Sequence, residues 1–466
     1  MKSQYYIFLF GAYTCSAFAQ VLPPDRTNFA DQASFKQPEL LKKSSVKINT
    51  LSPTVSDQMG LEQLINTAIT TQNWKDLEHL LNTYKNTPNY DVILYQYGFG
   101  ALYRHQGKYT QAIHLYRSML NANPDLVYPR FDLGVMLFEN KQYKDAETEL
   151  KQVYPQVSGN VQAIIRQVLK VIDKTQSWTP QFNLSYQRTN NVNQASDAKE
   201  IVVNDAVFIR SEDSMPQKAE GMSYQLGVSK SNNLFGNHYS YFALNFNGTS
   251  YWDNSDYSEQ TLRANVGYQY KDHHKSIGVI PFIEQNILGD NRYGKNYGTN
   301  LLYSQKLTNK LQISTNTSYI QKTYRDESLA RIYNGKNYGQ SVFLTYQPVG
   351  NWMAYTGLDF VYDDLKDESE SSKKKGIRIG FLHSNPILSF DTSLGYGKRK
   401  FEADNLWYGK VRSDDEYQFN VSVWNQQLQW KGFIPKLNYF YRKIDSNLPL
   451  YQRDNSNVYL SVFRNF

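Results

Sequence analysis

The most restrictive feature of this sequence is a period-two alternation of apolar and polar residues that begins at Trp178 and continues to Phe466. The apolar face of one such run is formed by Leu262, Ala264, Val266, Tyr268 and Tyr270. Strands of soluble sheets average about five or six residues. These runs last about ten to fourteen, the length with which a tilted strand spans a bilayer. The pattern predicts a transmembrane antiparallel β-barrel of about 14 strands over residues 177–466.

The composition supports a barrel and excludes two other classes of protein. After residue 20 no apolar run is long enough for a membrane-spanning helix. Aromatic residues make up 15% of the chain, far too many for a disordered protein. The formal net charge is +7 with only 20% charged residues, and the charges are not clustered, so we expect no nucleic-acid partner.

The start of the chain predicts export from the cytoplasm. Lys2 precedes an apolar stretch at residues 5–12, and a small-x-small cleavage site follows at residues 17–19. This order is typical of a secretory signal peptide, here residues 1–19. The single cysteine, Cys15, falls inside it, so we expect a mature chain with no disulfide and no cysteine-bound metal. Residues 20–57 are polar and rich in proline, and we interpret them as an extended or disordered segment.

Residues 58–176 have a helical period and repeat at an offset of about 34 residues, which is the tetratricopeptide period. The repeated positions are Phe99 and Leu133, Gly100 and Gly134, Tyr109 and Tyr143, and Ala112 and Ala146. A degenerate copy precedes them around Trp74, and residues 162–173 predict a capping helix. The fold class is therefore α+β multidomain, with an N-terminal all-α tetratricopeptide-repeat domain before the C-terminal barrel.

The first helices of successive repeats line a concave surface in such arrays, which is a common binding site for an extended client peptide. The client-binding residues that we predict on this surface are Leu94, Tyr97, Arg104, Tyr128, Phe131 and Phe138. For any one of them, ordinary packing between repeats is the simpler interpretation. As a set they exceed what packing alone requires.

Charged residues within the alternating runs belong to the face opposite the apolar one. The residues predicted to face the lumen are Arg263, Asp359, Arg378, Asp391, Lys436 and Arg442. They could screen a passing polymer or form a structural ladder, and the sequence favours neither. Short connections alternate with long ones, which predicts periplasmic turns beside the repeats and external loops opposite them. Tryptophans near strand ends, Trp424 among them, predict interfacial girdles.

Motifs for catalysis and metal binding are missing from the sequence, which predicts a protein that is not an enzyme and has no cofactor. The pair His273 and His274 is adjacent rather than spaced for one metal, and we interpret it as a solvated turn. The acidic residues between Asp363 and Glu370, followed by three lysines at 373–375, lack the ligand spacing of a calcium loop. They predict a solvated external loop.

Three short motifs add a resemblance to a known family. They are Gly-Phe-Ile-Pro-Lys-Leu at 432–437, Ser-Asn-Leu-Pro-Leu-Tyr at 446–451 and Asn-Asn-Val-Asn-Gln-Ala at 190–195, together with the terminal strand to Phe466. With the order of signal peptide, short repeat domain and barrel, the chain resembles the Slam family, the surface lipoprotein assembly modulators of type XI secretion. The resemblance covers nearly the whole mature chain.

That resemblance implies a translocon in the outer membrane of a Gram-negative bacterium, with the repeats in the periplasm. Its expected partners are a client protein, either a surface lipoprotein or a soluble haem- or metal-capture protein, and outer-membrane lipid. The barrel-assembly machinery and periplasmic chaperones are further candidate partners. The alternative is a tetratricopeptide-barrel polysaccharide exporter. An outer-membrane enzyme would need a catalytic cluster that we cannot assemble, and a passive porin leaves the repeats unexplained.

Overall fold

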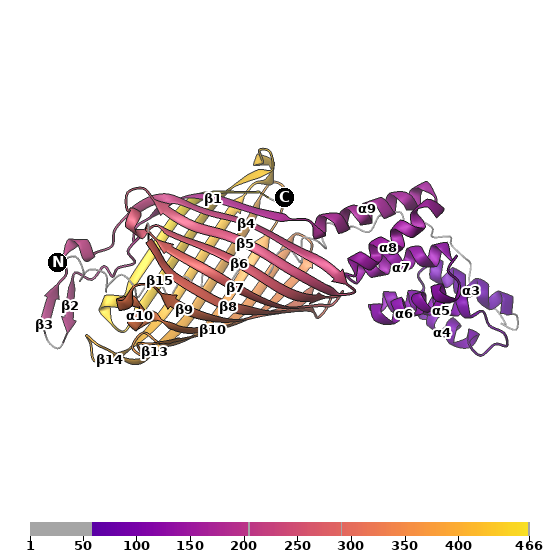
Figure 1. Cartoon of the computed structure of the whole chain (residues 1–466), viewed down its shortest axis with the longest axis horizontal. Helices are drawn as coiled ribbons and strands as arrows, with labels where there is room; N and C mark the ends of the chain where they lie inside the picture. Colours follow the sequence, from indigo (N-terminus) through magenta and orange to yellow (C-terminus); the bar gives the residue numbers. More distant parts are fainter. Residues whose placement is uncertain (1–57, 204–205, 290, 465–466) are drawn as a thin grey trace.

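A computed structural model describes residues 58–203, 206–289 and 291–464. A helical domain projects from one end of a β-barrel (Figure 1). The predicted signal peptide, residues 1–19, and the segment 20–57 lie outside the described residues.

The helical domain consists of three antiparallel helix pairs and a longer final helix. Its helices are α3 (Gln58–Thr70), α4 (Trp74–Tyr84), α5 (Val92–His105), α6 (Tyr109–Ala122), α7 (Val127–Glu139), α8 (Tyr143–Val153) and α9 (Gly159–Gln176). Polar side chains fix two of the starts, because Asn73 accepts from the backbone N–H of Asp76 and Asp91 accepts from that of Ile93. In the described part of the chain, no helix combines the length and apolarity that a membrane crossing requires.

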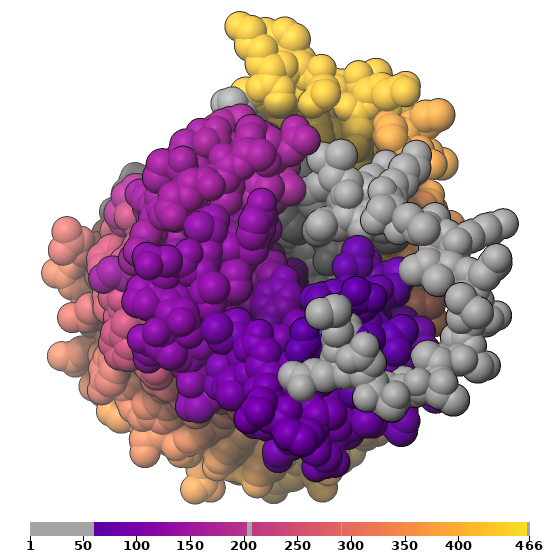
Figure 2. Space-filling view, turned by 90° about the vertical axis from the view of Figure 1, so that its right-hand side faces the viewer, coloured from indigo at the N-terminus to yellow at the C-terminus, as the bar shows by residue number. Residues whose placement is uncertain are grey.

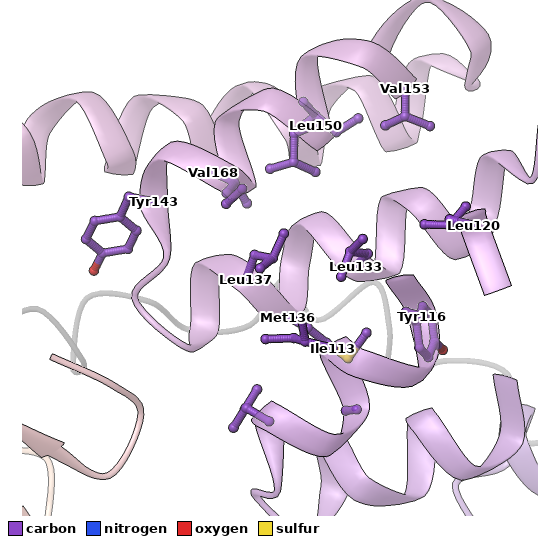
Figure 3. Packing of buried hydrophobic residues seen from close by; sticks show 14 of the residues in the cluster. Ile113, Tyr116, Leu120, Leu133, Met136, Leu137, Tyr143, Leu150, Val153 and Val168 are labelled. Atoms are coloured by element: carbon purple, nitrogen blue, oxygen red, sulfur yellow. The ribbon is translucent and has the colours of Figure 1, made fainter. Parts of the chain in front are cut away.

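Small residues at equivalent positions allow the two helices of a repeat to approach closely. Gly100 on α5 lies against the ring of Tyr116 on α6, and Gly134 on α7 lies against Leu150 on α8. A Cβ atom at Gly134 would lie only 2.7 Å from the Leu150 side chain. The buried core between the repeats includes Leu133, Met136 and Leu137 (Figure 3). The predicted repeat architecture is confirmed.

Fourteen antiparallel strands close into a barrel, in the order β1, β16, then down through the sequence to β4. They are β1 (Thr179–Thr189), β4 (Ala219–Phe235), β5 (His238–Tyr251), β6 (Glu259–Lys271), β7 (Lys275–Leu288), β8 (Asn291–Lys306), β9 (Leu311–Tyr324), β10 (Gly335–Val349), β11 (Trp352–Leu365), β12 (Ser372–His383), β13 (Ser389–Asn405), β14 (Lys410–Trp424), β15 (Phe433–Ser446) and β16 (Arg453–Arg464). The predicted fold class is therefore confirmed.

The alternation separates an exposed apolar outer face from a polar inner face. Leu262, Val266 and Leu358 are 43%, 55% and 48% exposed, whereas their neighbours Asn265 and Asp359 are buried. Large apolar side chains on an outer face are what a bilayer requires of a barrel. The girdle prediction is wrong for Trp424. It is registered against Lys436 and its ring lies under the Lys436 ammonium, because the period of the strand turns it toward the lumen.

The two ends of the barrel differ in their connections. At the end that carries the helices, which we call the repeat end, the connections include turns at 236–237, 272–274, 307–310 and 350–351. At the opposite loop end, segment 190–218 contains the hairpin β2 (Glu200–Val203) and β3 (Ala206–Ile209), and segment 325–334 contains α10 (Glu327–Tyr333).

Candidate functional site: the repeat groove, the barrel lumen and the interface between them

The repeat domain contacts the barrel through two turns, the one between α5 and α6 and the one between α7 and α8. In the first turn, the Gly107 carbonyl lies 3.0 Å from Nε2 of His274. In the second, Oδ1 of Asn140 accepts from the backbone N–H of His273, whose ring centroid lies 4.5 Å from that of Tyr109. Our interpretation of the two histidines as a solvated turn is therefore wrong for His273, which is half-buried, whereas the His274 side chain is exposed. The repeat domain covers His273, which an exposed turn sequence does not reveal.

A second set of contacts joins α8 and α9 to the turn between β4 and β5. Oδ1 of Asn233 accepts from the backbone N–H of Lys144 at 2.9 Å, and Oε1 of Gln176 accepts from that of Asn233 at 3.0 Å. The Tyr239 hydroxyl donates to the Lys141 carbonyl, and the Tyr239 ring is only 2% exposed. Buried polar groups with satisfied hydrogen bonds specify one orientation. The repeat domain is thus fixed over the side of the barrel formed by the early strands (Figure 2).

Docking of the repeat domain is expected to weaken as the pH falls from about 6.5 to about 4. Burial lowers the pKa of His273 from 6.5 to about 4, assisted by Lys306 and His274. Above pH 6.5 His273 is neutral whether docked or free, so the interface is intact. Between the two values the free turn binds a proton that the docked turn does not, which favours undocking. Resonance energy transfer between labels on α4 and on the barrel measures this population.

The matched control for this pH dependence is His273→Phe, which keeps a ring beside Tyr109 and cannot be protonated. We expect this variant to stay docked across the same pH range. If the wild-type chain and the variant undock in parallel, the titrating group is not His273.

Two of the predicted groove residues bind the next repeat. The Tyr97 hydroxyl donates to Asp132 at 2.8 Å, and Arg104 donates to Glu139 through Nε at 2.8 Å and Nη2 at 2.7 Å. Both pairs join α5 to α7, so they hold successive first helices together. Burial raises the pKa of Asp132, and the Arg104 charge opposes that rise. These contacts are the inter-repeat packing that the sequence left open.

The other four predicted groove residues differ in exposure. Leu94, Phe131 and Phe138 are half-buried against the apolar clusters of the repeats. Tyr128, near the start of α7, is 65% exposed. An exposed aromatic ring on the first helix of a repeat is available to a client, whereas Tyr97 and Arg104 already have partners. The client-binding role of all six residues stays a prediction.

The six residues predicted to face the lumen lie on the polar face of their strands. Nη2 of Arg378 contacts Asp359 at 2.7 Å, and Nε of Arg263 contacts Glu284 at 2.6 Å. Nη2 of Arg442 contacts Glu416 at 3.0 Å. Lys436 lies over Trp424, with 4.6 Å from its ammonium to the ring centroid, and Asp391 pairs in register with Ser422. Several of these charges are therefore compensated within the barrel wall.

The alternation argument missed most of the ionic network to which these residues belong. Oxygens of Glu416 on β14 accept from Lys374 at 2.6 Å and from Arg399 and Arg442 at 3.0 Å. One further carboxylate, Asp363, accepts from Lys322 at 2.9 Å and from Arg399 at 3.2 Å. The Glu416 and Asp363 side chains are 5% and 0% exposed.

The solvated-loop interpretation of the segment from Asp363 to residue 375 is therefore wrong for Asp363 and Lys374. Strand β11 runs to Leu365 and β12 begins at Ser372, so the period-two face carries both side chains into the lumen. The sequence did contain a signal for this placement, because Asp363 and Lys374 both fall on the polar face when the period-two alternation of β11 and β12 is continued. Among the residues that the structure describes, no group of three or more His, Cys, Asp or Glu is placed to hold a metal ion.

A closed antiparallel barrel with an apolar outer face, a polar lumen and helical repeats fixed over one end defines an outer-membrane β-barrel protein with an attached tetratricopeptide domain. Residues 178–466 match the family model described as surface lipoprotein assembly modifier, and residues 52–150 match the model of its N-terminal repeats. The chain belongs to the surface lipoprotein assembly modifier family, which confirms the resemblance seen in the sequence.

Named relatives match over most of their length. A surface lipoprotein assembly modifier of Pasteurella multocida is 27% identical, covering 99% of this chain and 96% of the relative. Surface lipoprotein assembly modifier 1 of Haemophilus influenzae is 27% identical over 86% of this chain and 83% of the relative. A protein of Acinetobacter baumannii called hemophilin secretion modulator is 24% identical over 96% of this chain and 94% of the relative.

Proposed function

We propose that this protein is an outer-membrane translocon that exports specific client proteins to the cell surface or the medium. The observation that carries the proposal is the fixed placement of the repeat domain at one end of the barrel, through buried contacts such as Asn233 with Lys144 and Tyr239 with Lys141. A receptor domain held at the mouth of a channel raises the local concentration of a bound client there.

The repeat domain lies in the periplasm in this proposal. The two longest connections of the barrel, residues 190–218 and 325–334, lie at the loop end, which also has a short connection between β7, ending at Leu288, and β8, beginning at Asn291. The connections at the repeat end are shorter than either of these two, such as 236–237 and 350–351. Outer-membrane barrels place short turns in the periplasm and long loops outside the cell. The client binds the repeats in an extended form, passes the barrel and folds outside. Folding there supplies direction, and no catalytic residue takes part.

The clients are surface lipoproteins or secreted haem- or metal-capture proteins. The family name refers to surface lipoproteins, and the Acinetobacter relative is called a hemophilin secretion modulator. Contacts with outer-membrane lipid, with the barrel-assembly machinery and with periplasmic chaperones complete the proposed set of partners.

Deletion of the gene is expected to remove one or two nutrient-capture proteins from the cell surface or the medium and to retain them in the periplasm. Quantitative mass spectrometry of protease-shaved and secreted proteins, compared with the parent strain, measures the loss. Reintroducing the intact chain should restore export. An unchanged protein profile with loss of capsule or biofilm polymer would instead support a polysaccharide exporter.

Complementation with single variants then tests the receptor role. Tyr128→Ser removes the exposed aromatic ring on α7, and we expect it to lower client export several-fold without lowering the amount of folded barrel. His114→Ser, an exposed position on the neighbouring helix α6, is the matched control and should export normally. Equal export by the two variants would contradict a role for Tyr128 in client binding.

A further inference from the structure

Among the residues that the structure describes, the seam between the first and last strands is the least paired junction of the barrel. Strands β1 and β16 are in register at five positions, Asn183 to Tyr186 and then Thr189. The pairing lapses between them, at Gln187 and Arg188. On its other side the same strand pairs with β4 at eleven positions without a gap. Each missing pair removes backbone hydrogen bonds that otherwise hold neighbouring strands together.

At the loop end, hydrogen bonds that involve side chains join the two strands where the backbone pairing ends. Ser456 donates its backbone N–H to Oδ1 of Asn190 at 3.3 Å, and Nδ2 of Asn191 donates to the Asp454 carbonyl at 3.3 Å. Arg453 donates to the Gln194 carbonyl at 3.1 Å. The asparagine-rich motif at 190–195 is thus a clasp between the end of β1 and the start of β16.

The clasp also connects two motifs that are far apart in the sequence. Ser196 follows the asparagine-rich motif directly, and its hydroxyl donates to the Pro449 carbonyl at 2.8 Å, within the motif at 446–451. These bonds are individually weak, since a net contribution of about 1 kcal/mol is typical of one hydrogen bond. Side-chain bonds of this kind can break and reform more readily than a continuous strand ladder.

Buried amide groups on both sides of the seam lack hydrogen-bond partners. Oδ1 of Asn183 on β1 and Oδ1 of Asn457 on β16 are buried without one in the part of the chain that the structure describes. Asn457 on β16 lies opposite Thr189 on β1, and both residues are buried. Buried acceptors without partners are costly, and they can accept N–H groups from a passing backbone.

We propose that the β1–β16 seam is a strand-edge site that parts to accept an extended strand of the client. Parting the seam in a bilayer exposes a row of backbone N–H and C=O groups, and lipid cannot satisfy them. An added β-strand can satisfy them, whereas a lipid chain or a polysaccharide cannot offer the matching ladder. The seam therefore opens only onto an extended peptide. This inference rests on the proposed function in protein export.

A disulfide across the seam tests this inference. Ser185 on β1 lies opposite Ser461 on β16, both are small and buried, and opposite residues have the Cα separation that a disulfide needs. The double variant Ser185→Cys and Ser461→Cys is expressed in the deletion strain. Surface display of the client found by mass spectrometry is measured before and after oxidation. We expect export to fall by at least about tenfold on oxidation and to return with reductant, because a disulfide prevents the strands from parting.

The same row of the barrel supplies the matched control. Ser223 on β4 lies opposite Thr249 on β5, and their hydroxyls are 2.6 Å apart in a fully paired junction. Oxidised Ser223→Cys and Thr249→Cys should export normally. Normal export through the locked seam overturns the proposal, and so does equal loss with both disulfides, which would indicate a general widening of the barrel. A reduced variant that exports nothing shows that the two substitutions themselves impair the barrel, and the cross-linking experiment below then decides, while the gene deletion tests the proposed function separately.

Photo-cross-linking identifies what occupies the seam. A photoreactive amino acid replaces Val462, an outward residue of β16, or Leu226, an outward residue of β4 with similar exposure. We expect a cross-link to the client from position 462 and none from position 226. Cross-links to lipid alone from both positions would overturn the proposal.

Discussion

Replacing Glu416 with alanine is expected to destabilise the barrel by about 3–5 kcal/mol, because it removes a buried anion that three cations share. Its carboxylate binds Lys374, Arg399 and Arg442 within 3.0 Å, and the Lys374 and Arg399 side chains are 4% and 2% exposed. Without Glu416, Asp363 still binds Arg399, but the three cations share less negative charge and repel one another more strongly in the lumen. The midpoint of urea unfolding in lipid vesicles, followed by the mobility shift of the folded barrel on gels, measures the change.

The control for this variant is Glu402→Ala on the neighbouring strand β13. Glu402 pairs with Lys373 at 2.7 Å, but the Lys373 side chain is 66% exposed. An exposed pair of this kind contributes about 0–1 kcal/mol. Equal losses of stability in the two variants would show that the buried network does not hold the barrel wall together.

Leu137→Ala in the repeat domain is expected to cost about 2–5 kcal/mol in the free energy of unfolding, the range for a buried leucine that leaves a cavity. Leu137 is 0% exposed within the core of Figure 3. Repeats stabilise one another through their interfaces, so loss at α7 should propagate to α8 and to its contacts with the barrel. Thermal unfolding followed by circular dichroism at the helical wavelengths measures the loss, and client export should fall with it.

Val92→Ala is the matched control for the repeat domain. Val92 lies at the start of α5 and is 50% exposed, so its truncation removes little buried area. We expect its effect to stay within about 0.5 kcal/mol. A comparable loss from Val92→Ala would mean that the core around Leu137 does not dominate the stability of the repeats.

The period-two and 34-residue periodicities of the sequence predicted the barrel and the repeats, and three short motifs predicted the family to which the chain belongs. Leu262 and Val266 alternate with polar residues because neighbouring side chains of a strand point to opposite faces. Gly100 and Gly134 recur because two helices approach closely at equivalent places in each repeat. Both signals depend on residues within one strand or one repeat, so they can be read without knowledge of distant contacts.

Contacts between distant segments could not be predicted in the same way. His273 lies in a short turn between two strands, as an exposed residue would, yet it is half-buried against Asn140 and Tyr109 of the repeat domain. Asp363 is one of several acidic residues in a stretch that resembles a solvated loop, yet it binds Lys322 and Arg399 from other strands. Nothing in the residues between two such partners indicates that the partners lie close together in the fold.

The sequence by itself determined the order of the repeat domain and the barrel, the period-two alternation of the strands and the lumen face of charges within clear runs, such as Arg263 and Asp359. These follow from the geometry of the chain over a few neighbouring residues. Only the tertiary structure decided that Arg104 joins two repeats, that Glu416 binds three cations and that Asn191 fastens the first strand to the last. Barrel closure brings strands together that are hundreds of residues apart, and the hydrogen bonds formed there depend on register and burial, which are properties of the assembled sheet.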